Sequence, residues 1–135
     1  MFILNDMIFI GNPHGGAGHK GEVYVFTLLD NKWQQTDLLL PGNIARGFGK
    51  SITVNDKYLV IGNPSTGEAD TPVFHSGSVF VYARENSGWK RKVHLVPMGR
   101  PKGVSFGRRV LLTSGENPAL LIQAAKDIYR YDLAL

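Results

Sequence analysis

Short apolar runs separated by turn-forming residues dominate the chain. The runs are four to eight residues long, are rich in Val, Ile, Tyr and Phe, and are bounded by Gly, Asn, Asp and Pro. This pattern is typical of β-strands, and no stretch shows a helical period of apolar residues. The sequence therefore predicts an all-β fold.

The middle of the chain shows the pattern most clearly and predicts four strands, at residues 50–54, 58–61, 78–83 and 89–96. The second and third are almost wholly apolar, which in an antiparallel sheet indicates that both faces are covered. The fourth alternates, so we expect Trp89, Val93 and Leu95 to face inward and Lys90, Lys92 and His94 to face outward. Lysines on an edge strand discourage pairing with another chain, which favours this strand as the outer edge of its sheet.

Several sequence blocks recur in the same order. Asn5-Asp6 recurs as Asn55-Asp56, residues 10–13 as 61–64, residues 21–26 as 77–82, Trp33 as Trp89, and Phe48-Gly49 as Phe106-Gly107. The separation grows from 50 residues (55 − 5) to 58 (106 − 48), as expected when loops lengthen around fixed strands. A weaker third copy follows at 108–113, 119–124 and 127–131.

A four-stranded unit of about 50 residues in tandem points to a β-propeller, with a β-sandwich as the competing fold. We expect a single propeller segment over 1–135, with one blade at 1–47, a second at 48–105 and a partial third at 106–135. This is about two and three-quarter blades, whereas propellers close with roughly four to eight. The first unit lacks a Phe-Gly pair and the third lacks a fourth strand, which favours a chain cut within blades. We therefore expect an incomplete ring with apolar end faces, covered by a second copy, a longer chain or partner subunits.

The recurring blocks resemble a known family. Phe48-Gly-x-Ser51, the Tyr-Leu-Val-Ile-Gly-Asn-Pro segment at 58–64, Gly-Ser-Val-Phe-Val-Tyr at 77–82 and Gly88-Trp89 are similar to the FG-GAP repeat. That repeat forms the propeller blades of integrin α-subunits and of many bacterial surface proteins, here in a calcium-poor bacterial form. The resemblance implies a non-enzymatic module for protein or glycan binding, cell adhesion or assembly, secreted or at a cell surface. The kelch repeat is the nearest alternative, although its Gly-Gly doublet is missing.

Calcium-binding members of this family place an acidic loop between the first and second strands. The corresponding turns at 5–7, 55–57 and 114–117 are short and carry few carboxylates, whereas calcium takes six to eight oxygen ligands. We therefore expect no calcium, and no cofactor of another kind.

Composition narrows the remaining classes. The 135 residues include no Cys and are 43% hydrophobic and 19% charged, which argues against disordered, collagen-like and disulfide-stabilised proteins. The net charge of +4 favours acidic partners without indicating nucleic acid. No apolar run approaches the ~20 residues that cross a membrane, and the first residues lack the pattern of a secretory signal.

The candidate catalytic motifs have simpler interpretations. Gly49-Lys50-Ser51 resembles part of a phosphate loop, but Ile44 stands where that motif needs Gly, and a strand follows. Glu68 and Asp70 form an acidic pair of the kind used in glycoside hydrolysis, yet nothing nearby would raise one pKa. Two His in a loop, with His75 elsewhere, are a weak metal motif without a carboxylate. We therefore predict no catalytic and no metal-binding residues.

Topology gathers the candidate binding residues. In an up-and-down blade, the loops after the second and fourth strands emerge at the same end, and long loops on a rigid scaffold often bind ligands. The predicted binding residues there are His14, His19, Lys20, Arg46, His75, Arg100 and Lys102. The favoured function is a non-enzymatic interaction module, and the alternative is a lectin or hydrolase that binds a sugar or anion with these basic loops.

Overall fold

The computed structural model describes residues 1–42, 46–67, 71–86 and 88–133. Within these ranges the chain forms antiparallel β-sheets, with one short 3-10 helix, η1 (Ala17–His19). The expected all-β class is therefore confirmed. In the middle of the chain, the ends of the predicted strands lie within one or two residues of the observed ones. The second and third of these strands are buried on both faces over most of their length, as predicted.

Three sheets follow one another along the chain. The first contains β1 (Phe2–Leu4), β2 (Met7–Asn12), β3 (Glu22–Leu29) and β4 (Lys32–Leu39), in that spatial order. The second contains β5 (Ser51–Val54), β6 (Tyr58–Asn63), β7 (Ser78–Glu85) and β8 (Gly88–Leu95), again in order. The third has three strands, β9 (Arg109–Leu112), β10 (Ala119–Ala124) and β11 (Asp127–Asp132). All pairings within the sheets are antiparallel, and none of the sheets closes on itself.

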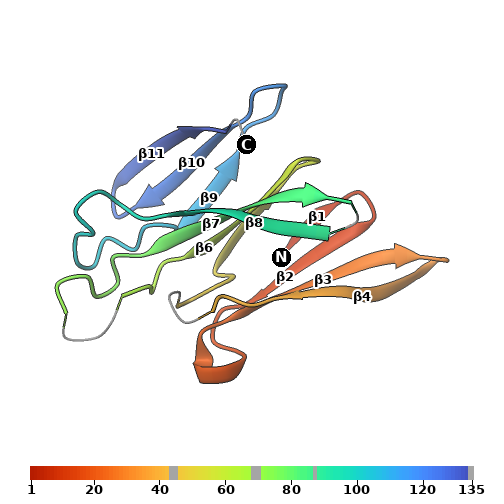
Figure 1. Cartoon of the computed structure of the whole chain (residues 1–135), viewed down its shortest axis with the longest axis horizontal. Coiled ribbons are helices and arrows are strands. Elements are labelled where there is room, and N and C mark those ends of the chain that lie inside the picture. Colours follow the sequence, from red (N-terminus) through yellow and green to blue (C-terminus); the bar gives the residue numbers. More distant parts are fainter. Residues whose placement is uncertain (43–45, 68–70, 87, 134–135) are drawn as a thin grey trace.

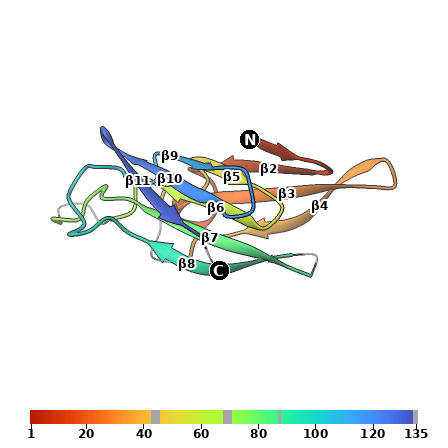
Figure 2. The same ribbon diagram turned by 90° about the horizontal axis from the view of Figure 1, so that it is seen from above.

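The sheets lie beside one another in chain order, with β5–β8 in the middle (Figure 1). Their innermost strands adjoin, since β1 contacts β5 and β5 contacts β9. Figure 2 shows β5 and β9 towards one side of the molecule and β8 towards the other. The arrangement is that of successive blades in an unclosed array.

Two hydrophobic cores fill the spaces between the sheets. Between the first and second sheets, Phe9, Val23 and Val25 pack with Leu59, Ile61 and Phe80. Between the second and third sheets, Val60, Val79 and Val81 pack with Leu120 and Ile122. The middle sheet contributes to both cores because alternate residues of a strand point to opposite faces. This explains why β6 is buried along its whole length.

At each junction between sheets, a Phe pairs with a Gly that is distant in sequence, and we call this contact the Phe-Gly junction. Phe48 is fully buried and forms an isolated parallel bridge with Gly21, and Phe106 does the same with Gly77. The amide of Phe48 donates to Lys20 O at 3.0 Å, and the amide of Phe106 donates to Ser76 O at 2.9 Å. Phe48 therefore packs in the core between the first two sheets.

The expectation for the outer strand β8 is wrong for His94 and for Trp89, which packs towards the first sheet and does not share a face with Val93 and Leu95. The register shifts between Val81 and Tyr82, so the alternation of β8 does not continue unbroken. His94 is half-buried with its ring 4.5 Å from that of Phe80, while Val93 and Leu95 pack towards the third sheet. A one-residue shift moves a side chain to the other face of its sheet, which explains the difference.

Candidate interaction surfaces

Long loops meet at one end of the array. The amide of Arg46, in the β4–β5 connection, donates to Thr66 Oγ1 in the β6–β7 loop at 3.2 Å. In the β8–β9 loop, Gly103 N donates to Phe74 O at 2.8 Å and Ser105 N donates to His75 O at 2.9 Å. Hydrogen bonds therefore link the β6–β7 loop both to the connection that enters the middle sheet and to the loop that leads into the third sheet.

The β2–β3 loop holds three of the predicted binding residues. His14 and His19 are exposed, and the two residues contact each other, with 3.1 Å between His19 Nδ1 and His14 O. Lys20 is half-buried and holds Phe48 through its carbonyl. Its neighbourhood includes a mostly apolar hollow of about 350 Å³, lined by Ala17, Gly18, Lys20, Gly21, Leu40, Pro41 and Gly42.

The other predicted binding residues lie on the remaining long loops. Arg46, Arg100 and Lys102 are exposed, whereas His75 is half-buried and stacks on Phe74 with 3.9 Å between ring centroids. His19 and His75 each stand two residues before the glycine of a Phe-Gly junction, and both adopt a left-handed backbone, with φ of 53° and 52°. Glu68 and Asp70 lie outside the described residues. Within the described ranges, no three His, Asp or Glu side chains cluster as a metal site would require.

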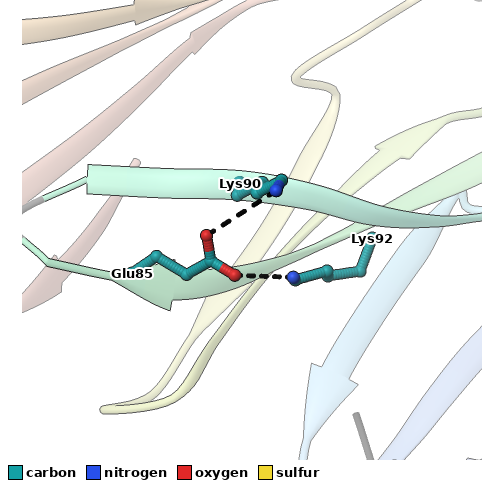
Figure 3. Close-up of polar contacts among 3 residues, drawn as sticks. All are labelled: Glu85, Lys90 and Lys92. Carbon is teal, nitrogen blue, oxygen red and sulfur yellow. Dashed lines mark hydrogen bonds and ion pairs between the residues drawn. The ribbon is translucent and has the colours of Figure 1, made fainter.

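The basic stretch from Arg84 to Arg109 is not one uniform surface. Glu85 lies between Lys90 and Lys92, at 4.0 and 2.6 Å, on the outer hairpin of the middle sheet (Figure 3). The hydrogen bond from Lys92 lowers the pKa of Glu85 below its ordinary value. Part of the positive charge is thereby compensated locally, so this stretch attracts acidic partners less strongly than its sequence suggests.

Arg91 belongs to an aromatic cluster between the first two sheets. Its guanidinium carbon lies 3.7 Å from the centre of the Phe80 ring, and Nη2 donates to Leu40 O at 2.9 Å and to Tyr82 Oη at 3.1 Å. Burial raises the pKa of Tyr82, and the hydrogen bond from Arg91 opposes that change. Burial also lowers the pKa of His94, helped by the positive charges of Arg91 and Arg100. The Arg91 side chain therefore links β8 to the β4–β5 connection and has a structural role.

A further candidate surface is the free face of the first sheet. Residues of β2 and β3 alternate between the buried core and the opposite face, where Ile10 pairs with Tyr24 and Ile8 with Phe26. We call this opposite face the β1–β4 free face. It carries Ile3, Ile8, Ile10, Tyr24, Phe26, Leu28, Trp33 and Leu38.

Several of these side chains are strongly exposed for their type. The exposed fractions are 59% for Ile3, 36% for Ile10, 47% for Trp33 and 40% for Leu38. Large apolar patches on soluble proteins mark sites of interaction. Tyr24 donates a hydrogen bond to Glu22, which raises the pKa of the tyrosine and places a carboxylate at the margin of the patch. The candidate site was thus predictable as an exposed blade face, although its aromatic content follows only from the observed register.

Comparisons with known proteins leave the family open. No model of a known protein family matches the chain, and no curated protein matches it. Among the described residues, no helix is long and apolar enough to cross a membrane. The function therefore has to be argued from the surfaces themselves.

Proposed function

We propose that the chain is a non-enzymatic interaction module, built of FG-GAP-like blades, that works through its exposed sheet faces in protein association or structural assembly. The observation that carries the proposal is the β1–β4 free face, with eight apolar side chains on one side of a sheet. A secreted or cell-surface setting, as the family resemblance implies, and glycan binding at the long loops belong to the same proposal.

The face has the composition expected of a binding surface. Aromatic residues are enriched at interfaces, and Trp and Tyr often supply most of the binding energy there. Trp33, Tyr24 and Phe26 all lie on this face. The long-loop end offers a weaker surface, because His14 and His19 contact each other and His75 stacks within its own loop.

A pair of matched variants tests the proposal. Ile10→Glu places a carboxylate in the centre of the β1–β4 free face, whereas Met98→Glu makes the same change at a loop residue that is 95% exposed. We expect the unaltered chain either to associate or to bind the dye 8-anilinonaphthalene-1-sulfonate. Ile10→Glu should weaken association or reduce dye binding, because one of the apolar faces then carries a charge, and Met98→Glu should leave both unaltered. Light scattering and dye fluorescence over a concentration series measure both quantities.

A second variant separates the loops from the face. Changing His14, His19, His75 and Arg100 together to Ala removes the predicted loop contacts and should leave association and dye binding unaltered. The proposal fails if the unaltered chain is a monomer that binds no dye. It also fails if this fourfold variant loses binding to an array of immobilised glycans while Ile10→Glu changes neither mass nor dye binding.

A further inference from the structure

The third sheet also has a free face, and its residues match those that receive a neighbouring sheet elsewhere in the chain. In the third sheet, Leu121 and its partner Leu111 occupy the register positions of Phe9 and Phe2 in the first sheet. Likewise, Gln123 and its partner Ile128 occupy the positions of Gly11 and Val23. Phe9 and Val23 are fully buried by the second sheet, whereas Leu111 is 56% and Ile128 is 70% exposed. We call this surface, with Arg109, Leu111, Leu121, Gln123, Ile128 and Arg130, the β9–β11 free face.

The β1–β4 free face matches the opposite partner of the same junction. Ile8, Ile10, Tyr24 and Phe26 occupy the register positions that Leu59, Ile61, Phe80 and Tyr82 occupy in the middle sheet. Those four residues of the middle sheet are buried against the first sheet. The two free faces of the chain therefore correspond to the two sides of a junction that the chain already makes internally.

One contact shows how the aromatic residues would fit. Trp89 packs edge-on against Phe9 across the first junction, with 5.9 Å between ring centroids. Trp33 stands at the position of Trp89 in the first sheet, and Leu121 stands at the position of Phe9 in the third. If the two free faces pack as the internal junction does, Trp33 of one chain contacts Leu121 of another.

The two free faces differ in charge, with Arg109, Arg130 and Asp132 on the β9–β11 free face and Glu22 on the β1–β4 free face. The β9–β11 free face carries the exposed Arg109 and Arg130, and Arg130 contacts Asp132 only at the surface, where both side chains are well exposed. The β1–β4 free face carries Glu22 at the start of β3. Attraction between this carboxylate and the two arginines would favour the pairing of the two faces, and like charges in the same places would oppose it.

A junction between the two free faces would differ from the two internal junctions in one respect. A Cβ atom on Gly62 would lie 2.1 Å from Gly107 O, and one on Gly77 would lie 2.2 Å from Phe106 O. The third sheet has Gln123 and Lys126 at these positions. Because their side chains occupy the space that the glycines leave open, a Phe-Gly junction like the two internal ones cannot form at this free face. A sheet that docks there contributes its apolar face alone.

We propose that the β1–β4 free face of one copy packs on the β9–β11 free face of a second copy, head to tail. This inference rests on the proposed function and names the partner of its principal surface. Two copies joined at both ends would contain six sheets, within the range of about four to eight at which propeller rings close. Such a pair leaves neither apolar face in contact with water.

Charge exchange between two variants tests the pairing. Variant X carries Arg109→Glu with Arg130→Glu, and variant Y carries Glu22→Arg. Each variant alone would place like charges across both junctions, so we expect each to dissociate at concentrations about tenfold or more above the unaltered chain. In an equimolar mixture of X and Y, one junction pairs introduced Glu with introduced Arg, and the other is unaltered. The mixture should therefore recover the mass of a pair, and Lys57→Glu, at a hairpin turn, should have no effect.

Cross-linking tests which faces meet. The chain has no Cys, so each introduced thiol is unique. A short bismaleimide should join Trp33→Cys to Leu121→Cys when the two variants are mixed and should join neither variant to itself. Circular dichroism of every variant confirms that the strands are retained before its mass is interpreted.

The outcomes separate this inference from the proposed function. Recovery of the pair in the mixture, with cross-linking only between the two faces, supports the head-to-tail pair. Failure of X and Y to complement, or cross-linking of Trp33→Cys to itself, overturns it. An unaltered chain that stays monomeric but binds dye in an Ile10-dependent manner overturns the pair and leaves the interaction module standing. A monomer without such dye binding overturns both.

Discussion

Gly62, in β6, lies against the backbone of Gly107, which precedes the third sheet. A Cβ atom there would lie 2.1 Å from Gly107 O and 2.1 Å from Ser51 Oγ, and the backbone oxygen cannot move away as a flexible side chain could. We expect Gly62→Ala to lower the free energy of unfolding by about 1–3 kcal/mol, because the sheets must separate to admit the methyl group. Urea unfolding measures this change.

A matched glycine controls for the cost of the substitution itself. Gly88, the first residue of β8, likewise has no positive φ, and the nearest atom to a Cβ there is Glu85 O at 4.0 Å. Gly88→Ala should therefore leave stability nearly unchanged. Equal destabilisation by both variants would contradict the close approach at Gly62.

His94 makes stability depend on pH in one direction. Burial, with the nearby positive charges of Arg91 and Arg100, holds its pKa in the folded state below the ordinary value of 6.5. The unfolded chain then binds the proton more tightly, so this contribution is complete above pH 6.5 and is lost as the pH falls below it. His94→Gln should reduce the acid-induced loss of stability between pH 7.5 and 5.5, measured as urea midpoints. An identical pH profile would show that His94 is not the source.

At the scale of elements, the outer strand β8 is fixed by its aromatic and cationic contacts. Trp89 packs on Phe9 of the first sheet, and the Arg84 guanidinium lies 5.6 Å from the Trp89 ring. We expect Trp89→Ala to cost about 2 kcal/mol of unfolding free energy, less than a fully buried aromatic residue, because Trp89 is only half-buried.

Trp33→Ala is the matched change at the corresponding position of β4. Trp33 is 47% exposed, so its loss should leave the unfolding free energy of the isolated chain nearly unchanged while weakening association. Guanidinium unfolding at low protein concentration, followed by light scattering at high concentration, separates the two effects. Similar destabilisation by both variants would contradict the assignment of Trp33 to an open face.

The strands were predictable because local pattern decides them. The continuous apolar run of β6 and its neighbour β7 indicated coverage on both faces, and both strands are buried in the middle sheet. The position of His94 was not predictable, because it depends on a register shift between Val81 and Tyr82 that leaves no clear trace in sequence. The place of Arg91 on Phe80 likewise depends on a contact between residues of different strands.

The candidate surfaces were predictable to different extents. An exposed blade face follows from counting units, whereas its composition required knowing which residues of β2 and β3 alternate outward. The predicted long-loop residues are spread over several loops, where backbone hydrogen bonds such as Ser105 N to His75 O set their positions. Such bonds carry no side-chain signature, so sequence alone could indicate the end of the sheets but not the arrangement there.

At the scale of the whole molecule, stability should decline from the middle sheet outward. The middle sheet belongs to both hydrophobic cores, whereas each end sheet belongs to one. In the Ile10→Glu variant, we expect the slowest amide hydrogen exchange in β6 and β7 and the fastest in β1 and β11. Exchange followed by mass spectrometry measures this order. Uniform protection across the three sheets would contradict it.

The division of the interior into two cores also governs how the chain responds to mechanical load. A force that pulls on the two ends acts on the outer sheets first, and each can detach while the other core stays packed. Extension in an optical trap should then proceed in discrete steps, with the last rupture belonging to β5–β8. A tether built from this chain would yield gradually under tension instead of failing at once.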